Sequence, residues 1–363
     1  MENRGADLAI TIAVLTLVGI GVIMVLSASS IQALSTYGDS YYFFKRQLGW
    51  AIIGLFLMYF LSRVDYHYIV RYSKILLLIG FVGLIIVLMP QFGYIAGGSR
   101  RWLVFGPIVI QASELAKFAL IVYMASYLSR KSEKLSSLNG LLPPLFLLGV
   151  ACYLILLEPD LGTAVSIGLT VMVMFFVAGA RLHHLGGLTL LSLPLLYYFV
   201  MGEPYRRQRF LSFLDPWADP LDTGFHIIQS LYALGSGGVF GLGFGQSKQK
   251  FFYLPAPSTD FIFAVLGEEL GLMGSSLILV LFFVIAWRGV VIGLKAPDLL
   301  GSLLAIGLTA MIVLQAIINI GVVTGSLPIT GISLPFISYG GSSLVIMMSA
   351  AGILLNVSRQ VRV

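Results

Sequence analysis

Long apolar stretches, separated mostly by short polar ones, dominate the pattern of this chain. A window of about 19 residues, the length that crosses a bilayer as a helix, finds about ten of them. They cover residues 8–26, 48–62, 75–88, 115–128, 141–157, 163–177, 185–201, 261–286, 299–320 and 342–355. We therefore predict an all-α polytopic integral membrane protein, with one transmembrane domain over residues 1–363.

Two longer segments interrupt this pattern. Residues 202–259 are largely polar, but apolar positions in 225–234 recur at helical spacing, which predicts an amphipathic helix lying on the membrane. Residues 321–341 contain no charge and several Pro and Gly residues. Irregular backbone at membrane depth must be buried in protein or line a cavity, so we expect a re-entrant loop that forms a cavity wall.

The basic residues predict the orientation. With the amino terminus inside, the short inner loops hold roughly three times as many Lys and Arg residues as the short outer loops. This places both termini in the cytoplasm, in a cytoplasmic (inner) membrane, and puts residues 202–259 and 321–341 at the outer face. The net charge of +6 suits inner loops that contact anionic membrane lipids.

Composition excludes several classes of protein. With 58% hydrophobic and 10% charged residues, the chain has too few charges for a soluble domain of this length. No basic stretch carries interleaved aromatic residues, so we expect no nucleic-acid partner. Cys152 is the single cysteine, which excludes a disulfide within the chain and a thiolate metal site.

The most informative polar residue is Asp260, where the outer segment meets a very apolar stretch. One interpretation is a helix cap, because Asp accepts bonds from the free N–H groups of a first helical turn. However, Glu268 and Glu269 follow about two turns later, where hydrocarbon should surround the helix. Acidic side chains at that depth are costly and usually functional, so a cap alone does not explain all three carboxylates.

Other polar residues near the outer face have two interpretations each. Arg101 beside Trp102 can bind phosphate oxygens while the indole stacks on a sugar, or the pair can anchor the chain at the interface. Glu114 and Lys117 share a helix face and form either a buried ion pair that fixes packing or part of an anion-binding cavity. Arg209 belongs to a basic cluster that holds a pyrophosphate or is simply solvated.

Two further pairs complete the outer set. Glu158 and Asp160 lie in a short connection, where they bind a divalent cation, steer a substrate or cap the next helix. Gln315 and Asn319 are four residues apart and therefore face the same way, which is typical of polar contacts between helices. The glycine run around residues 235–243 lacks the features of a nucleotide loop and indicates a hinge or a close approach of backbones.

These blocks, in this order, resemble the SEDS family (shape, elongation, division and sporulation), and they cover nearly the whole chain. The resemblance rests on Arg101-Trp102, 111–117, 158–160, 213–216, Gln229-Ser230, 259–264, 268–271 and 328–343. The short amino terminus is more similar to the elongation members than to the division members.

The resemblance implies a peptidoglycan glycosyltransferase that polymerises lipid II at the outer face of the membrane for cell elongation and rod shape. Its partners would be lipid II, a class B penicillin-binding protein (a PBP2-like transpeptidase) and the elongation machinery. The chemistry would be one inverting displacement, with Asp260 as general base.

The residues expected to bind substrate are Arg101, Trp102, Glu114, Lys117, Glu158, Asp160, Arg209, Gln229, Ser230, Thr259, Gln315, Asn319, Ser338 and Ser342. A divalent cation, Mg²⁺ or Mn²⁺, held by Glu114 or Asp160 is an alternative cofactor, and no other cofactor is expected. A lipid II flippase and a non-catalytic scaffold for the transpeptidase are the competing functions.

Overall fold

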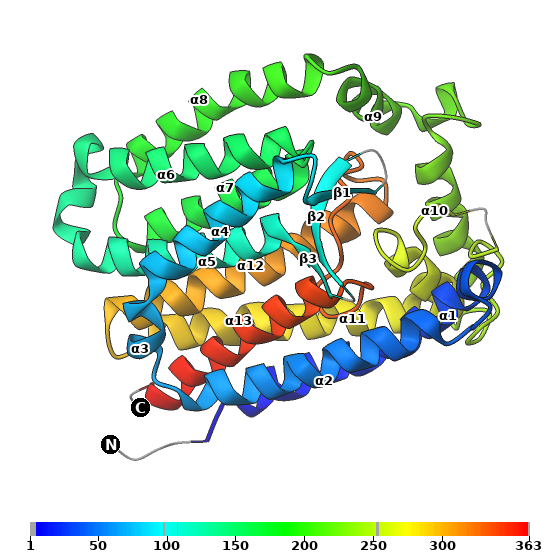
Figure 1. Ribbon diagram of the computed structural model, residues 1–363, viewed down its shortest axis with the longest axis horizontal. Helices are drawn as coiled ribbons and strands as arrows, with labels where there is room; N and C mark the ends of the chain where they lie inside the picture. The colour runs from blue at the N-terminus through cyan, green and yellow to red at the C-terminus, as the bar shows by residue number, and fades with distance from the viewer. Residues whose placement is uncertain (1–4, 97–98, 107, 252–253, 362–363) are drawn as a thin grey trace.

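The computed structural model describes residues 5–96, 99–106, 108–251 and 254–361, most of which are helical (Figure 1). The helices are α1 (Leu8–Tyr37), α2 (Tyr42–Arg63), α3 (Tyr66–Arg71), α4 (Ser73–Leu88), α5 (Ala112–Arg130), α6 (Leu138–Leu157), α7 (Leu161–Val177), α8 (Leu182–Met201), α9 (Pro204–Leu214), α10 (Phe225–Gly237), α11 (Ile262–Leu294), α12 (Leu299–Val323) and α13 (Gly341–Gln360). Short 3₁₀ turns lie at Ser132–Ser136 and Pro216–Ala218.

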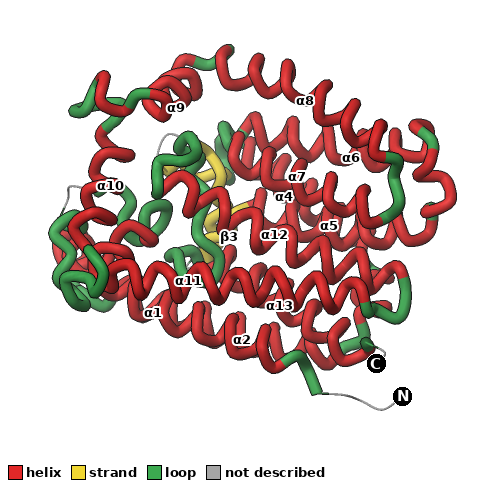
Figure 2. The backbone as a smooth tube through the Cα atoms, turned by 180° about the vertical axis from the view of Figure 1, so that it is seen from behind, coloured by secondary structure: helices red, strands yellow, loops and turns green. Residues whose placement is uncertain are grey.

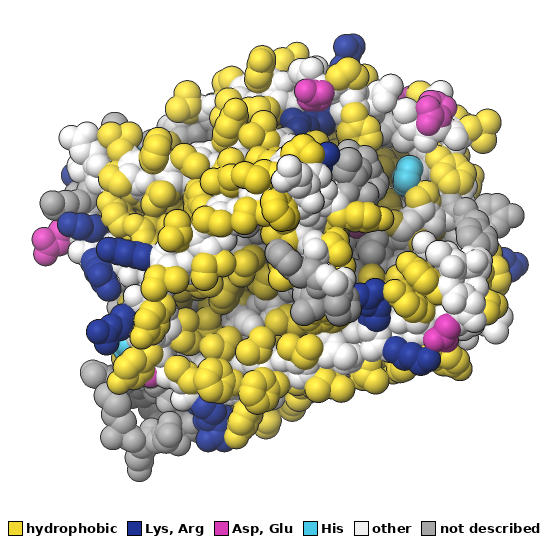
Figure 3. Space-filling view, in the orientation of Figure 1, with side chains coloured by type: hydrophobic (Ala, Val, Ile, Leu, Met, Phe, Trp, Pro, Cys, Tyr) yellow, Lys and Arg dark blue, Asp and Glu magenta, His cyan; other side chains and the backbone are white. Residues whose placement is uncertain are grey.

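The helices match the predicted apolar stretches. Each stretch lies within one helix, except that Phe261 precedes α11 by one residue. Among the described residues, six helices are long and apolar enough to cross a membrane, namely α1, α6, α8, α11, α12 and α13, and α4 and α7 are shorter apolar helices. Figure 3 shows hydrophobic side chains over most of one face of the molecule, with Lys and Arg towards its edges. A multi-pass helical membrane protein is confirmed, and the exact number of spans stays a prediction.

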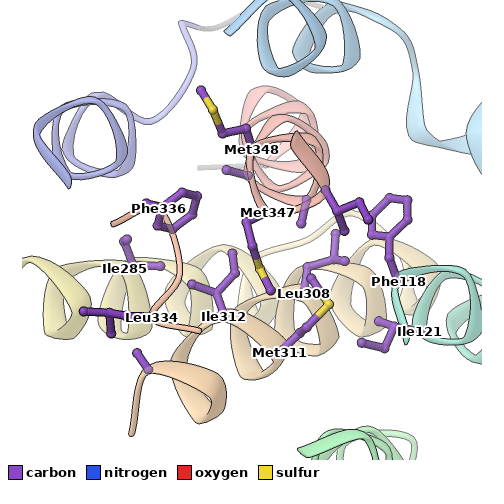
Figure 4. Close-up of a cluster of buried hydrophobic side chains, with 14 of the residues drawn as sticks. Phe118, Ile121, Ile285, Leu308, Met311, Ile312, Leu334, Phe336, Met347 and Met348 are labelled. Atoms are coloured by element: carbon purple, nitrogen blue, oxygen red, sulfur yellow. The ribbon is translucent and has the colours of Figure 1, made fainter. Parts of the chain in front are cut away.

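Helix α12 lies at the centre of the bundle and packs against α5, α7, α11 and α13. Its buried side chains Leu308 and Met311 meet Ile121 of α5 and Met347 of α13 (Figure 4). Hydrocarbon is as apolar as these side chains, so within a bilayer it is close packing and polar contacts that favour helix association. The polar side chains of α12 are therefore informative, and two of them reach the candidate site.

Helix α8 is different, because it stands at the edge of the bundle (Figures 1 and 2). The structure describes all of its residues, and none of them is buried. A largely apolar helix that its neighbours cover only in small part suits direct contact with lipid.

The predicted all-α fold has one local exception, between α4 and α5. The described residues there include a three-stranded antiparallel sheet of β1 (Gly93–Ala96), β2 (Ser99–Phe105) and β3 (Ile108–Gln111), in the order β1-β2-β3. The segment is rich in β-branched and aromatic residues, which favour strands, and Gly106 adopts a positive φ of 59° at the turn between β2 and β3. The strands are too short to give a clear alternating pattern in the sequence, and they were not predicted.

The outer segment contains the predicted amphipathic helix, but α10 does not lie freely on a membrane. Its residues Ile227, Ile228 and Ala233 are buried, and α10 packs against α11 and α12. The hydroxyl of Ser230 donates a 2.7 Å hydrogen bond to the Val323 carbonyl at the end of α12. The apolar face predicted to meet lipid therefore meets protein.

Residues 324–340, all of them described, contain no helix or strand and connect α12 to α13. Ile332, Leu334, Phe336 and Ile337 of this segment are buried. This is the environment that irregular backbone requires at membrane depth.

The described residues near the two ends, at the start of α1 and the end of α13, lie together at one end of the bundle (Figure 1). The Asp7 N–H donates to Ser358 Oγ over 3.0 Å, and the Asp7 carboxylate accepts a 2.9 Å bond from Arg288 Nε. This arrangement agrees with an even number of spans.

Candidate functional site

Asp260 lies in the turn immediately before α11, where the carboxylate meets a guanidinium group across a glycine. A Cβ atom placed on Gly331 would lie 3.6 Å from Asp260 Oδ2 and 3.8 Å from an amino nitrogen of Arg101. Gly331 also has a φ of 75°, a conformation that side chains disfavour. Glycine at this position therefore keeps open the space between the Asp260 carboxylate and the Arg101 guanidinium.

Asp260 does not cap α11. The turn is described from residue 254 onwards, and there Phe261 occupies the N-cap position with no capping bond from a side chain. Instead, the turn is held through its main chain. The Asn319 amide donates a 2.8 Å bond to the Asp260 carbonyl, and Ser338 Oγ donates a 2.6 Å bond to the Thr259 carbonyl. The carboxylate of Asp260 is therefore not used for capping.

Arg101, on β2, connects the site to the turn between α6 and α7. Its Nε donates to the Glu158 carbonyl over 3.1 Å, and one amino nitrogen donates to the Pro159 carbonyl over 2.6 Å. The other amino nitrogen lies 3.6 Å from Asp160 Oδ2. Asp160 also caps α7 by accepting a 3.0 Å bond from the Thr163 N–H, which confirms the cap interpretation of that residue.

Arg209, on α9, is the second cation near Asp260. Its guanidinium stacks on the Tyr205 ring, 4.3 Å from the centroid, and donates to the Ile329 carbonyl over 3.5 Å. Burial raises the pKa of the half-buried Asp260, while Arg101 and Arg209 lower it without cancelling the effect of burial. A carboxylate in this position is a stronger base than one in water, and the two cations that face it favour its ionised form.

A hollow lies beside Arg209 on the side of α8 and α9. Its volume is about 60 Å³, and its lining includes Pro159, Tyr205, Arg206 and Thr330. The hydroxyl of Thr330 is buried and has no partner among the described residues. A small, mostly apolar hollow with a few polar groups in its wall therefore adjoins one of the two cations.

Glu158 has an unusual environment. The side chain is fully buried, and within the described parts of the chain neither carboxyl oxygen has a hydrogen-bond partner. Burial raises the pKa of Glu158 to about 9, with a further contribution from Asp160 and an opposing one from Arg101. The carboxyl group therefore carries its proton at neutral pH.

Glu114 and Lys117 form the predicted buried ion pair, with 2.8 Å between Lys117 Nζ and Glu114 Oε1. Lys117 also donates to the side-chain oxygen of Gln315 on α12. The Gln315 amide in turn donates a 3.0 Å bond to the Ser333 carbonyl. These contacts connect α5 through α12 to the segment 324–340, and Asn319 makes the corresponding link to Asp260.

The remaining predicted residues lie around this centre. Trp102 is half-buried on β2 and pairs with Gln111 of β3, whose N–H donates a 3.1 Å bond to Ser342 Oγ. Gln229 is half-buried on α10, next to Ser230, whose hydroxyl is used for packing. The structure thus groups Arg101, Asp160, Arg209 and Thr259 around Asp260, and uses the hydroxyls of Ser230, Ser338 and Ser342 to join segments.

The residues proposed for a divalent cation do not fit a metal site. Asp160 is engaged by Thr163 and Arg101, and Glu114 is engaged by Lys117. Among the residues that the structure describes, no group of three His, Cys, Asp or Glu side chains is arranged to hold a metal. A divalent cation stays a prediction.

The partners of Glu268 and Glu269 were not predicted from the sequence. Both side chains are buried and bind the segment that precedes Asp260 and, in the case of Glu269, Ser27 of α1. The cost of acidic groups at that depth was a signal that a cation had to lie nearby. Lys250 is that cation, at 2.8 Å from Glu269 Oε1.

Comparison with known proteins identifies the family. Residues 8–363 match the FTSW_RODA_SPOVE model, described as "cell cycle protein". The chain is 51% identical to stage V sporulation protein E of Bacillus subtilis, covering 99% of both chains. It is 45% identical to a probable peptidoglycan glycosyltransferase FtsW of Geobacter metallireducens, covering 99% of this chain and 96% of that one.

Solved structures agree. One chain from a study of the "structural coordination of polymerization and crosslinking by a peptidoglycan synthase complex" has a TM-score of 0.80 and 31% identity, with 98% of each chain covered. The rod shape determining protein RodA of Thermus thermophilus has a TM-score of 0.72 and 27% identity, covering 98% of this chain and 97% of that one. The expected likeness to elongation members in particular is not confirmed, because the sporulation and division proteins share more of the sequence. This chain belongs to the FTSW_RODA_SPOVE family, the SEDS family that its sequence motifs predicted.

Proposed function

We propose that this chain is a peptidoglycan glycosyltransferase that polymerises lipid II at the outer face of the cytoplasmic membrane, with Asp260 as general base. The observation that carries the proposal is the Asp260 carboxylate, partly buried, facing Arg101 across Gly331 with Arg209 nearby. Relatives named as probable peptidoglycan glycosyltransferases, such as the FtsW of Geobacter metallireducens, support it.

The reaction follows from this geometry. Asp260 accepts the proton of the acceptor sugar hydroxyl while the hydroxyl oxygen forms a bond to the anomeric carbon of the donor. The bond from that carbon to the polyprenyl pyrophosphate breaks, and its electron pair leaves with the pyrophosphate. The charge that develops there needs fixed cations, which Arg101 and Arg209 supply. One displacement inverts the anomeric centre without a covalent intermediate on the enzyme.

The other candidates have supporting roles in this scheme. Lys117 already donates hydrogen bonds to Glu114 and Gln315, so it adds positive charge to the bundle but has few N–H groups left to bind a substrate. Glu158 is protonated near neutral pH and therefore adds no negative charge beside the leaving group. Trp102 is half-buried and directly follows Arg101 on β2, where neighbouring side chains point to opposite faces, so stacking of a sugar ring on its indole stays a prediction.

A crosslinking partner is part of the proposal. A relative at 31% identity was solved in work on a complex that coordinates polymerisation and crosslinking. We expect this chain to work with a class B penicillin-binding protein, the transpeptidase that crosslinks the new glycan. Both termini would lie in the cytoplasm and the site at the outer face.

The cellular process needs a separate test. The sequence analysis favoured cell elongation, whereas 51% identity to a stage V sporulation protein points to spore formation. Expression of this chain in strains that lack the elongation, division or sporulation member separates these roles. Restored rod shape supports elongation, and restored spore wall synthesis alone refutes it.

The enzymatic proposal is tested by polymerisation of purified lipid II in detergent, with the partner present. We expect glycan strands from the wild type, loss of product in Asp260→Asn, and normal product from the control Asp222→Asn, an exposed residue of the same outer segment. Detergent micelles have no leaflets, so product formation also distinguishes a polymerase from a flippase. Equal glycan yield from Asp260→Asn and wild type would refute the role of Asp260 as base.

A further inference from the structure

Helix α11 is interrupted at Gly271, where φ is 66° and ψ is −163°. The interruption leaves main-chain groups without helical partners, and residues 238–243 supply replacements. The Leu242 and Gly243 N–H groups donate to the carbonyls of Glu268 and Glu269 over 2.9 and 3.0 Å. In the other direction, the N–H groups of residues 272 and 273 donate to the carbonyls of residues 238 and 239 over 2.9 and 3.2 Å.

Glycines allow this close approach. A Cβ atom on Gly241 would overlap the Glu269 carbonyl, and one on Gly271 would overlap the main chain of Gly241. The glycines before α11 are therefore explained by the close approach of backbones, the second of the two predicted alternatives. The contact divides α11 into two helical parts, 262–270 and 272–294, which need not move as one rod.

The side chains of Glu268 and Glu269 reinforce the same junction. Glu268 accepts a 2.5 Å bond from Ser247 Oγ and a 2.8 Å bond from the Lys248 N–H. Glu269 accepts a 2.6 Å bond from Ser27 Oγ of α1 and a 2.8 Å bond from Lys250 Nζ. Residues 27, 247, 250, 268 and 269 are all buried.

A buried ion pair contributes little net stability, because the cost of desolvating the charges offsets their attraction. Its effect on geometry is more informative. Part 262–270 begins directly after the Asp260 turn. That turn is fastened by Asn319 and Ser338, whereas the far end of the part is fastened by the contacts of Glu268 and Glu269.

We propose that Glu269, paired with Lys250 and Ser27, is a positioning residue that fixes helical part 262–270 and thereby the location of the Asp260 carboxylate. This inference rests on the proposed function of Asp260. The interruption at Gly271 makes the arrangement necessary, because the membrane-spanning remainder of α11 cannot hold the first part through a continuous helix. The side chains of α1 and of the outer segment hold it instead.

The test compares Glu269→Gln with wild type in lipid II polymerisation, with rates normalised to folded, monodisperse protein. Displacement of a catalytic group by about 1 Å can lower a rate roughly 100-fold, so we expect kcat to fall roughly 10- to 100-fold. The KM for lipid II should stay within about twofold, because the substrate contacts remain. The acid limb of the pH profile of kcat/KM should also move, since Asp260 shifts relative to Arg101 and Arg209.

The matched control is Asp7→Asn, which breaks the ion pair with Arg288 on the part of α11 beyond the interruption. We expect its kcat to equal that of the wild type. Lys250→Arg, which keeps a cation, should retain more activity than Lys250→Met. If Glu269→Gln does not fold, Ser27→Ala tests the positioning role instead. This variant loses one hydrogen bond to Glu269, and we expect its kcat to decrease about two- to fivefold.

The outcomes separate the two proposals. An unchanged kcat in the folded variant, or a raised KM with an unchanged kcat, overturns the positioning role while Asp260 remains the base. Full activity of Asp260→Asn in the same assay overturns the proposed base and the positioning role together. A lower kcat with unchanged KM and a shifted acid limb supports both.

Discussion

Arg101→Gln tests the electrostatics of the site most directly. In the structure Arg101 lowers the pKa of Asp260, although burial keeps that pKa above its ordinary value. Removal of the guanidinium should therefore raise the pKa of Asp260 further. A base must be ionised to act, so activity should be lost at a higher pH in the variant than in the wild type as the pH falls.

The size of the effect follows from the distance. Asp260 Oδ2 and an amino nitrogen of Arg101 lie 3.6 and 3.8 Å from the same point beside Gly331. The two charges are then within roughly 8 Å, which corresponds to about 2 kcal/mol at an effective dielectric constant of about 20. Water screens a half-buried carboxylate, so we take about half of this, about 1 kcal/mol, as the interaction whose loss raises the pKa of Asp260.

The assay is the pH dependence of kcat/KM for lipid II polymerisation, which reports ionisations of the free enzyme. We expect the acid limb of Arg101→Gln to lie about one pH unit above that of the wild type, together with a lower plateau. Arg100→Gln is the control, because neighbouring strand residues point to opposite faces and Arg100 donates to the Leu88 carbonyl instead. An acid limb that stays in place, or that moves to lower pH, would show that Arg101 does not act on the catalytic base.

Three further predictions concern stability, measured by thermal unfolding in detergent. Because the pKa of Glu158 is raised to about 9, the folded wild type should lose stability as the pH rises towards that value, and Glu158→Gln should remove this decline. Glu114→Gln and Lys117→Met should each cost about 3–5 kcal/mol by leaving a buried charge unpaired, and the double variant should cost less than their sum. Gly241→Ala should unfold more readily than Gly245→Ala, because both glycines have a φ of 80° but only the first faces backbone within 4 Å. The same decline with pH in Glu158→Gln and wild type would contradict the raised pKa of Glu158. Equal melting temperatures of wild type and the ion-pair variants, or of the two glycine variants, would contradict the corresponding contact.

Features that depend on local pattern could be predicted from the sequence. The apolar stretches gave the helices, and the spacing of Glu114 and Lys117 gave their ion pair because residues three apart share a helix face. Asp160 was correctly expected as a candidate cap, and the short connection around it fixed its place. These features need information from only a few neighbouring residues.

Features that depend on distant residues could not be predicted. Arg101 binds the carbonyls of residues 158 and 159, and Ser27 binds Glu269, which is far away in the chain. One sequence contains no signal for such pairs beyond the rule that a buried acid needs a partner. The small sheet was missed for a related reason, since its short strands are stabilised by pairing with one another and not by their own periodicity.

The irregular segment 324–340 shows why the site depends on these distant contacts. In a helix the backbone N–H and C=O groups form hydrogen bonds with one another, as a membrane requires. The carboxylate proposed to meet a polar substrate lies among turns instead, and turns leave carbonyl groups without helical partners. Asn319 donates to the carbonyls of Ile332 and Asp260, and Gln315 donates to that of Ser333. The side-chain amides of Asn319 and Gln315 thus donate to main-chain carbonyls. We therefore expect substitution of either residue to change the position of Asp260 and not to remove a direct contact with lipid II.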